Sequence, residues 1–248
     1  MRFTPAHSIC CSHTTRRSFL KAAGIASGAG LLGAGLFGQL AYAAALTKAQ
    51  RDKLTPDEII AMMKRGNERF RSGKKSTQDF LAQQRASAKG QYPAAVILSC
   101  IDSRASAETI MELAIGDVFN ARVAGNVAND DILGSMEFAC AAAGAKVVLV
   151  MGHTACGAIK GAIDDVQLGN LTGLLARIQP AVKATAYQGD RSAKNSAFVD
   201  AVARRNVELT MENIRKGSSV LSDLKAKGTI NIVGAMYDIA SAKVDFFS

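Results

Sequence analysis

Four short runs of apolar residues divide the chain from residue 94 onward. Continuous apolar runs of this length predict strands that are buried on both faces. Because helix-like segments separate them, we expect an α/β fold: a mostly parallel β-sheet flanked by helices and built from right-handed crossovers. The segment 235–247 is predicted to add an edge strand. The predicted strands are 94–99, 118–123, 147–151 and 230–233, and the predicted helices are 105–115, 129–143, 155–166, 170–187 and 195–216.

A further helix is predicted to precede the sheet. Thr55 can cap it, Pro56 suits its first position, and the acidic residues Asp57 and Glu58 follow in the first turn. Residues 46–53 are polar, and we expect a linker there. The sequence therefore predicts a linker at 44–54 and a single domain at 55–248 with an N-terminal helical arm.

The first 43 residues have the pattern of a targeting segment. Residues 15–21 contain the pair Arg16 and Arg17, an uncharged run follows at 22–40, and Ala41-Tyr42-Ala43 offers a small-x-small cleavage site. Together they resemble a twin-arginine (Tat) signal peptide, which predicts export in the folded state to the periplasm. An uncleaved membrane anchor is the alternative, but the Gly and Ser residues of the run disfavour it. We expect no membrane association after cleavage.

The charge of the chain changes once this leader is set aside. The net charge of +9 falls to +5, because residues 1–43 contain four basic residues and no acidic one. The chain has no Trp and no basic–aromatic recognition motif. We therefore interpret the remaining surplus as a solubilising surface and expect no nucleic-acid partner.

Two cysteines and a histidine follow predicted buried strands. Cys100 comes after the run 94–99, and His153 and Cys156 come after the run 147–151. Ligand sites in open α/β sheets form beyond the carboxyl ends of strands, so the three side chains are candidates to meet there. A Cys₂His set suits Zn²⁺ and leaves a fourth position open. Buried core residues, or a closed structural zinc site, remain alternatives. Cys140 follows helical spacing with Met136, and we expect it to pack in the core.

Asp102 and Arg104 alternate with Cys100 along the chain. If this segment stays extended, all three side chains face the same way. The carboxylate can then accept a hydrogen bond from a water beside the metal, while the guanidinium holds it in place. The plainer alternative is a surface ion pair of little consequence.

These motifs resemble those of the β-class carbonic anhydrases. The resemblance rests on Cys-x-Asp-x-Arg at 100–104 and His-x-x-Cys at 153–156, and extends through Arg122-Val123-Ala124-Gly125-Asn126 and Leu133-Gly134-Ser135-Met136-Glu137 to Gly234-Ala235-Met236-Tyr237-Asp238. It covers residues 55–248. The segment Ala105-Ser106-Ala107-Glu108 departs from the family's usual sequence. This departure is expected to change one wall of the site.

The resemblance implies a function and an assembly. The expected enzyme is a zinc lyase with one Zn²⁺ per chain, which hydrates carbon dioxide reversibly to bicarbonate and a proton. Cys100, His153 and Cys156 would be the metal ligands, and Asp102 and Arg104 the catalytic pair. A homodimer or a higher even homo-oligomer is expected. Two alternatives stay open: a hydrolase of carbon disulfide or carbonyl sulfide with the same fold, and a non-catalytic zinc-binding protein.

Overall fold

The sheet has the strand order β2-β1-β3-β4-β5 within residues 45–248, the part of the chain that this computed structural model describes. Neighbouring strands run parallel except β5, which is antiparallel to β4. The predicted mostly parallel sheet is confirmed, and the predicted leader at residues 1–43 lies outside the described residues. The strands are β1 (Ala95–Ser99), β2 (Val118–Arg122), β3 (Val147–His153), β4 (Asn231–Tyr237) and β5 (Val244–Phe247).

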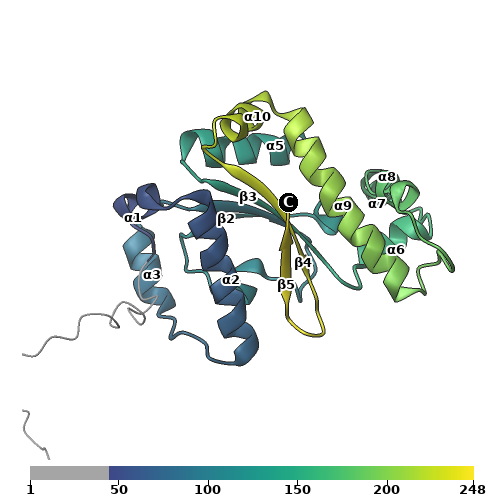
Figure 1. Ribbon diagram of the computed structural model, residues 1–248, viewed down its shortest axis with the longest axis horizontal. Coiled ribbons are helices and arrows are strands. Elements are labelled where there is room, and N and C mark those ends of the chain that lie inside the picture. Colours follow the sequence, from purple (N-terminus) through teal and green to yellow (C-terminus); the bar gives the residue numbers. More distant parts are fainter. Residues whose placement is uncertain (1–44) are drawn as a thin grey trace, which may run out of the picture. The chain divides into compact units, whose positions relative to one another are not determined.

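Helices cover both faces of the sheet (Figure 1). Helices α2 and α4 pack on one face, and α5, α9 and α10 on the other. The smaller helices α6, α7 and α8 pack against the first turns of α9. The helices are α1 (Lys48–Lys53), α2 (Pro56–Ser72), α3 (Phe80–Ser87), α4 (Ala107–Ile110), α5 (Asp130–Glu137), α6 (Gly157–Ile163), α7 (Gly169–Ala176), α8 (Gln179–Ala184), α9 (Ser196–Gly217) and α10 (Ser219–Ala226), with a 3₁₀ turn η1 (Ala124–Asn126) and a π-helical turn η2 (Phe138–Ala142).

Alternate residues of each central strand serve the two cores. In β1, Ile97 faces the core under α2, and its neighbours Val96 and Leu98 face the core near α5, α9 and α10. Both faces are covered, so all five residues of β1 are buried. This explains why the apolar runs are continuous rather than alternating.

The connections that follow β1 and β2 cross opposite faces of the sheet. The path from β1 to β2 passes through α4 on the α2 face, whereas the path from β2 to β3 passes through α5 on the other face. Strand order therefore reverses between β1 and β3. The carboxyl ends of these two strands form the position at which α/β sheets bind ligands.

Five segments differ from the prediction. The expected linker at 46–53 contains α1, capped by Thr47. The helix expected at 105–115 is only α4, because Glu112 takes a left-handed conformation that places its carboxylate 2.7 Å from Arg69. The helix expected at 170–187 is divided into α7 and α8, where Pro180 lacks a donor for a continuous helix. Helices α3 and α10 were not predicted; the Asp79 side chain caps α3, and the Ser218 side chain caps α10.

Other local expectations hold. Thr55 caps α2 through a reciprocal capping box with Glu58, and Pro56 occupies the first helical position. Within the segment 235–247, only Val244–Phe247 forms the added edge strand, because β4 extends to Tyr237. Among the described residues no helix is both long and apolar enough to cross a membrane.

Candidate metal centre

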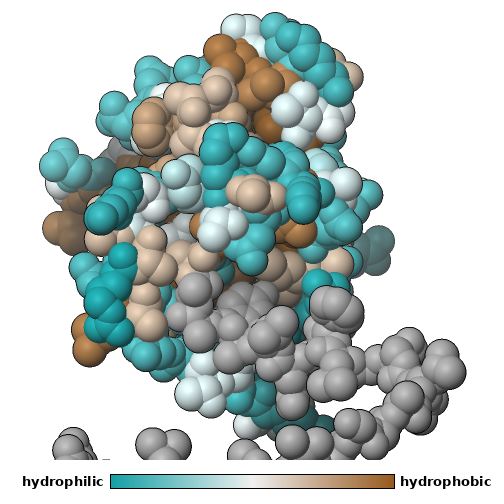
Figure 2. Space-filling model, turned by 90° about the vertical axis from the view of Figure 1, so that its left-hand side faces the viewer, coloured by the Kyte–Doolittle hydropathy of each residue, from teal (hydrophilic) through white to brown (hydrophobic). Residues whose placement is uncertain are grey.

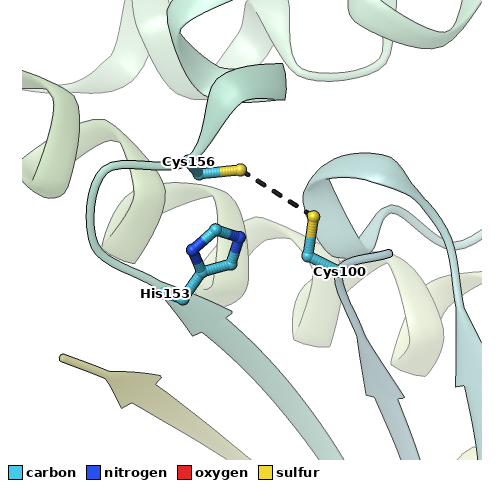
Figure 3. A group of neighbouring side chains, drawn as sticks. All are labelled: Cys100, His153 and Cys156. Atoms are coloured by element: carbon cyan, nitrogen blue, oxygen red, sulfur yellow. Dashed lines mark hydrogen bonds between the residues drawn. The ribbon is translucent and has the colours of Figure 1, made fainter. Parts of the chain in front are cut away.

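Three side chains converge at the reversal point between β1 and β3. Cys100 is the first residue after β1, His153 is the last residue of β3, and Cys156 is the N-cap of α6. Ser99 pairs with Met151 in the sheet, so Cys100 and His153 leave it at nearly the same level. Figure 3 shows the imidazole and the two thiols pointing toward one another.

The donor atoms of these residues are close and enclosed. They all lie within 4.8 Å of one another, and the two sulfur atoms are 4.0 Å apart. None of the three residues is more than 4% exposed. His153 Nδ1 lies 2.9 Å from the Thr154 carbonyl oxygen, which favours a proton on Nδ1 and a free lone pair on Nε2. Nε2 is buried and has no hydrogen-bond partner among the described residues.

The two thiols do not titrate alike. The pKa of Cys100 is held well below its usual range, first because the Cys156 thiol donates to its sulfur and also because the Gly125 N–H does, at 3.4 Å. The neighbouring Cys100 thiolate, together with burial, raises the pKa of Cys156. The pair therefore shares a proton that a cation between the sulfurs would displace, since metal binding requires thiolates.

Asp102 and Arg104 form a bidentate pair at the edge of this cluster. Arg104 Nε donates to Oδ1 at 3.0 Å and Arg104 Nη2 donates to Oδ2 at 2.8 Å. Hydrogen bonding from Arg104 keeps the pKa of Asp102 well below its usual range. Oδ2 also lies 3.9 Å from His153 Nε2. The segment is not extended as expected, because Ala105 N–H closes a turn onto the Asp102 carbonyl at 3.0 Å.

Arg122, at the end of β2, holds this turn from the neighbouring strand. Its Nε donates to the carbonyl of Cys100 at 2.9 Å, and its Nη2 donates to the carbonyl of Asp102 at 2.6 Å. The family resemblance included Arg122 in a motif without giving it a role. Its parallel register opposite Ser99 places it there, and that register is a property of the folded sheet.

Gly125 and Asn206 support Cys100 from behind. Gly125 has φ +68°, a conformation that favours glycine, and its N–H points at the Cys100 sulfur. The buried side chain of Asn206, on α9, donates to the Gly125 carbonyl at 2.7 Å. No local pattern pointed to Asn206, because its partner lies 81 residues away.

The turn between His153 and Cys156 is held by its backbone and by the Thr154 hydroxyl. Thr154 N–H donates to the Tyr237 carbonyl at 2.9 Å, and the Thr154 hydroxyl oxygen accepts from Ile239 N–H at 3.0 Å. Ala155 N–H donates to Asp200 Oδ1 at 2.9 Å. Asp200 was not predicted as a site residue; it lies in no motif, and only the packing of α9 brings it to this turn.

Three comparisons with known proteins agree with one another. A family model described as carbonic anhydrase matches residues 95–244. Carbonic anhydrase 2 of Mycobacterium tuberculosis is 35% identical over 183 residues, covering 71% of this chain and 86% of the relative. A solved structure from a study of two tetrameric β-carbonic anhydrases of Sordaria macrospora has a TM-score of 0.60 at 25% identity, covering 65% of this chain and 83% of that one. This chain belongs to the β-class carbonic anhydrase family.

The fold of this carbonic anhydrase also matches a more distant solved structure. The β-carbonic anhydrase of Coccomyxa, solved in complex with acetazolamide, has a TM-score of 0.58 at 22% identity, covering 76% of this chain and 81% of that one. At this identity the likeness shows the fold alone. The α/β architecture is therefore shared among proteins whose sequences have diverged widely.

The donor set of this carbonic anhydrase fits a zinc ion. Two sulfurs and one imidazole nitrogen are zinc's preferred ligand types, and three protein ligands leave a fourth tetrahedral position open. The unpartnered Nε2 of His153 is a buried acceptor that costs stability unless something binds to it. The cluster therefore has the chemistry of an open zinc site.

The third cysteine of the described residues is separate from this cluster. Cys140 is buried in the core beside Met136, as expected from its helical spacing. Burial alone raises its pKa to about 12, so its thiol stays protonated. It packs as a small apolar side chain and has no part in the site.

Proposed function

We propose that this chain catalyses the reversible hydration of carbon dioxide to bicarbonate and a proton, with Zn²⁺ held by Cys100, His153 and Cys156. The observation that supports this function best is the enclosed S₂N donor cluster with a restrained carboxylate at its edge. When bound there, zinc would supply the Lewis acidity that makes hydroxide available near neutral pH.

Asp102 would orient the attacking water. Its carboxylate lies beside the donor cluster, and because Arg104 lowers its pKa it stays an acceptor. Arg104 binds both oxygens and so keeps the carboxylate from rotating toward the sulfurs and the imidazole. The pair would thus leave the fourth position to water and hold a hydrogen-bond acceptor next to it.

The direct test is carbon dioxide hydration by protein whose zinc content has been measured, across a range of pH. We expect about one zinc per chain and activity that disappears when a chelator removes it and returns when zinc is restored. Acetazolamide, which the Coccomyxa enzyme binds, should inhibit it. Full zinc occupancy without hydration at any pH would favour a non-catalytic zinc protein.

A substrate panel separates carbon dioxide from its relatives. Carbon disulfide and carbonyl sulfide offer the same electrophilic carbon, so the cluster alone does not distinguish them. We expect hydration of carbon dioxide to exceed turnover of either compound. Faster turnover of a sulfur compound would instead assign the chain to the hydrolases of this fold.

We also propose that the enzyme is a homodimer or a higher even homo-oligomer. The related β-carbonic anhydrases of Sordaria macrospora are tetrameric. Within the described residues, β2 is an edge strand, and exposed apolar side chains flank it. Phe138 packs edge-on against Phe119 of β2. Phe80 and Ile115 line a hollow of about 390 Å³ beside Val118. Figure 2 shows the side of α1 and α3, where hydrophobic groups interrupt a largely hydrophilic surface. Light scattering of wild type and of Phe138→Asp tests this assembly; a monomeric wild type would contradict it.

Export by the twin-arginine route is a proposal as well. It rests on Arg16, Arg17 and the uncharged run that follows them. Because a receptor recognises the arginine pair, replacing both residues by lysine should leave the precursor in the cytoplasm. Fractionation would detect the change, and unchanged export would indicate the general secretory route or a membrane anchor.

A further inference from the structure

The metal-ligand turn contains a residue in an unfavourable backbone conformation. Ala155 lies between His153 and Cys156 and has φ +55°, a left-handed conformation that L side chains resist. A turn of this kind persists only where its surroundings hold it. The contacts at Ala155 therefore matter for the relative placement of the two ligands.

Two different elements hold the turn. Residues at and after the end of β4 bind Thr154 through the Tyr237 carbonyl and the Ile239 N–H. Ala155 is bound from the other side, where Asp200 of α9 accepts its N–H at 2.9 Å. Within the described residues, Asp200 is the hydrogen-bond acceptor found for the N–H of Ala155, the left-handed residue itself.

Helix α9 reaches the turn because Gly152 lets it approach β3. A side chain at Gly152 would come within 2.7 Å of Val207 and 3.6 Å of the Ala203 carbonyl. Residues 200, 203 and 207 lie on one face of the helix by their spacing. The close contact at Gly152 thus aligns α9 so that Asp200, two turns before Val207, meets the backbone of Ala155.

We propose that Asp200 is a positioning residue of the metal centre: it fixes the left-handed conformation of Ala155 and thereby the placement of His153 and Cys156. This inference rests on the proposed zinc site. Asp200 binds the backbone between two of the ligands rather than a donor atom, so its influence on the metal is indirect. Its loss should loosen the ligand geometry while leaving every ligand in place.

The experiment compares Asp200→Ala and Asp200→Asn with wild type. The alanine removes the acceptor, whereas the asparagine keeps an oxygen that can accept the same N–H. Glu208→Ala is the matched control, because Glu208 is an acidic residue of the same helix that pairs with Arg204 and Arg205 instead of the turn. Three quantities are measured: the rate of zinc release to a chelator, the hydrogen exchange of the Ala155 amide, and kcat and KM separately.

We expect Asp200→Ala to release zinc about tenfold faster, the lower end of the effect of residues that orient metal ligands. Exchange at Ala155 should accelerate in the metal-free protein as well, and kcat should fall more than KM changes. Asp200→Asn should stay within about twofold of wild type in zinc release, because the hydrogen bond is retained. If Asp200→Asn behaves like Asp200→Ala, charge rather than positioning is responsible and the proposal is wrong.

A second variant tests the mechanism through the backbone. Ala155→Gly removes the resistance to the left-handed conformation, so Asp200→Ala should accelerate zinc release less in that background than in wild type. Equal acceleration in both backgrounds would overturn the proposal, and so would unchanged zinc release in Asp200→Ala. A wild type that binds no zinc would instead refute the proposed function.

Discussion

The loops that follow β1 and β3 leave the same edge of the sheet, but different kinds of contact hold them. The loop after β1 is held by side chains nearer in sequence: Arg104 binds Asp102 from two residues away, and Arg122 binds it from 20 residues away. The loop after β3 is held through the Ala155 backbone and the Thr154 hydroxyl by residues 45 and 85 positions distant, Asp200 and Ile239.

This difference explains what a motif can reveal. The first loop carries part of its support as the charged pair Asp102 and Arg104, so its sequence shows both the proposed ligand and the proposed catalytic pair. The second loop shows only its proposed ligands, because the groups that stabilise it belong to distant segments: the Asp200 carboxylate, the Tyr237 carbonyl and the Ile239 N–H. Substitutions that remove a ligand or a support from each loop can therefore separate the two kinds of contact.

Removing a ligand from either loop should have the largest effect. Cys100→Ser and Cys156→Ser should each lose most of the zinc and nearly all hydration activity, because a hydroxyl is a much poorer zinc ligand than a thiolate. Metal analysis of purified protein measures this, with Cys140→Ser as a control that keeps its zinc. Normal zinc content in both variants would show that the ligands are misassigned.

Breaking the support of the first loop should separate catalysis from metal binding. Arg104→Ala leaves the three proposed ligands intact but frees Asp102 to rotate toward the metal position. We expect near-normal zinc and hydration lowered by about 10- to 100-fold. Arg177→Ala, at an exposed arginine after α7, is the matched control. If Arg104→Ala keeps wild-type turnover at every pH, the Asp102–Arg104 pair is only a surface ion pair without a role in catalysis.

The hydrogen bond from Asn206 of α9 to the Gly125 carbonyl, next to Cys100, should matter mainly for stability. Asn206→Ala leaves the Gly125 carbonyl buried without its donor, which should cost about 1–3 kcal/mol of unfolding free energy. Denaturant unfolding of the metal-free protein gives this quantity. A change below roughly 0.5 kcal/mol, the range of ordinary surface substitutions, would mean that water replaces the amide.

A weaker effect still is expected at the cysteine outside both loops. Cys140→Ala should keep full zinc and activity and lose about 1 kcal/mol of stability through a small cavity. Because burial raises the pKa of Cys140 to about 12, its thiol should resist alkylation at all pH values below that range while the protein is folded. Rapid labelling of the native protein under mildly alkaline conditions would show that the site opens.

Local pattern predicted the α/β class, the cap of α2 and the burial of Cys140 without any knowledge of the fold. It also predicted the convergence of Cys100 with His153 and Cys156, because parallel strands place their carboxyl ends together. It misjudged α4, α7 and α8, whose limits depend on the buried Glu112–Arg69 pair and on Pro180. It also expected an extended segment at 100–104, where Arg122 holds a turn instead.

The sequence alone could predict the residue types of this site and the strands that they follow, since strand patterns and ligand types are local properties. How those groups are held depends on the folded molecule. The roles of Arg122, Asn206 and Asp200 arise from strand register and from the close approach of α9 to Gly152. Such contacts join residues at least 20 positions apart along the chain, and no local spacing encodes them.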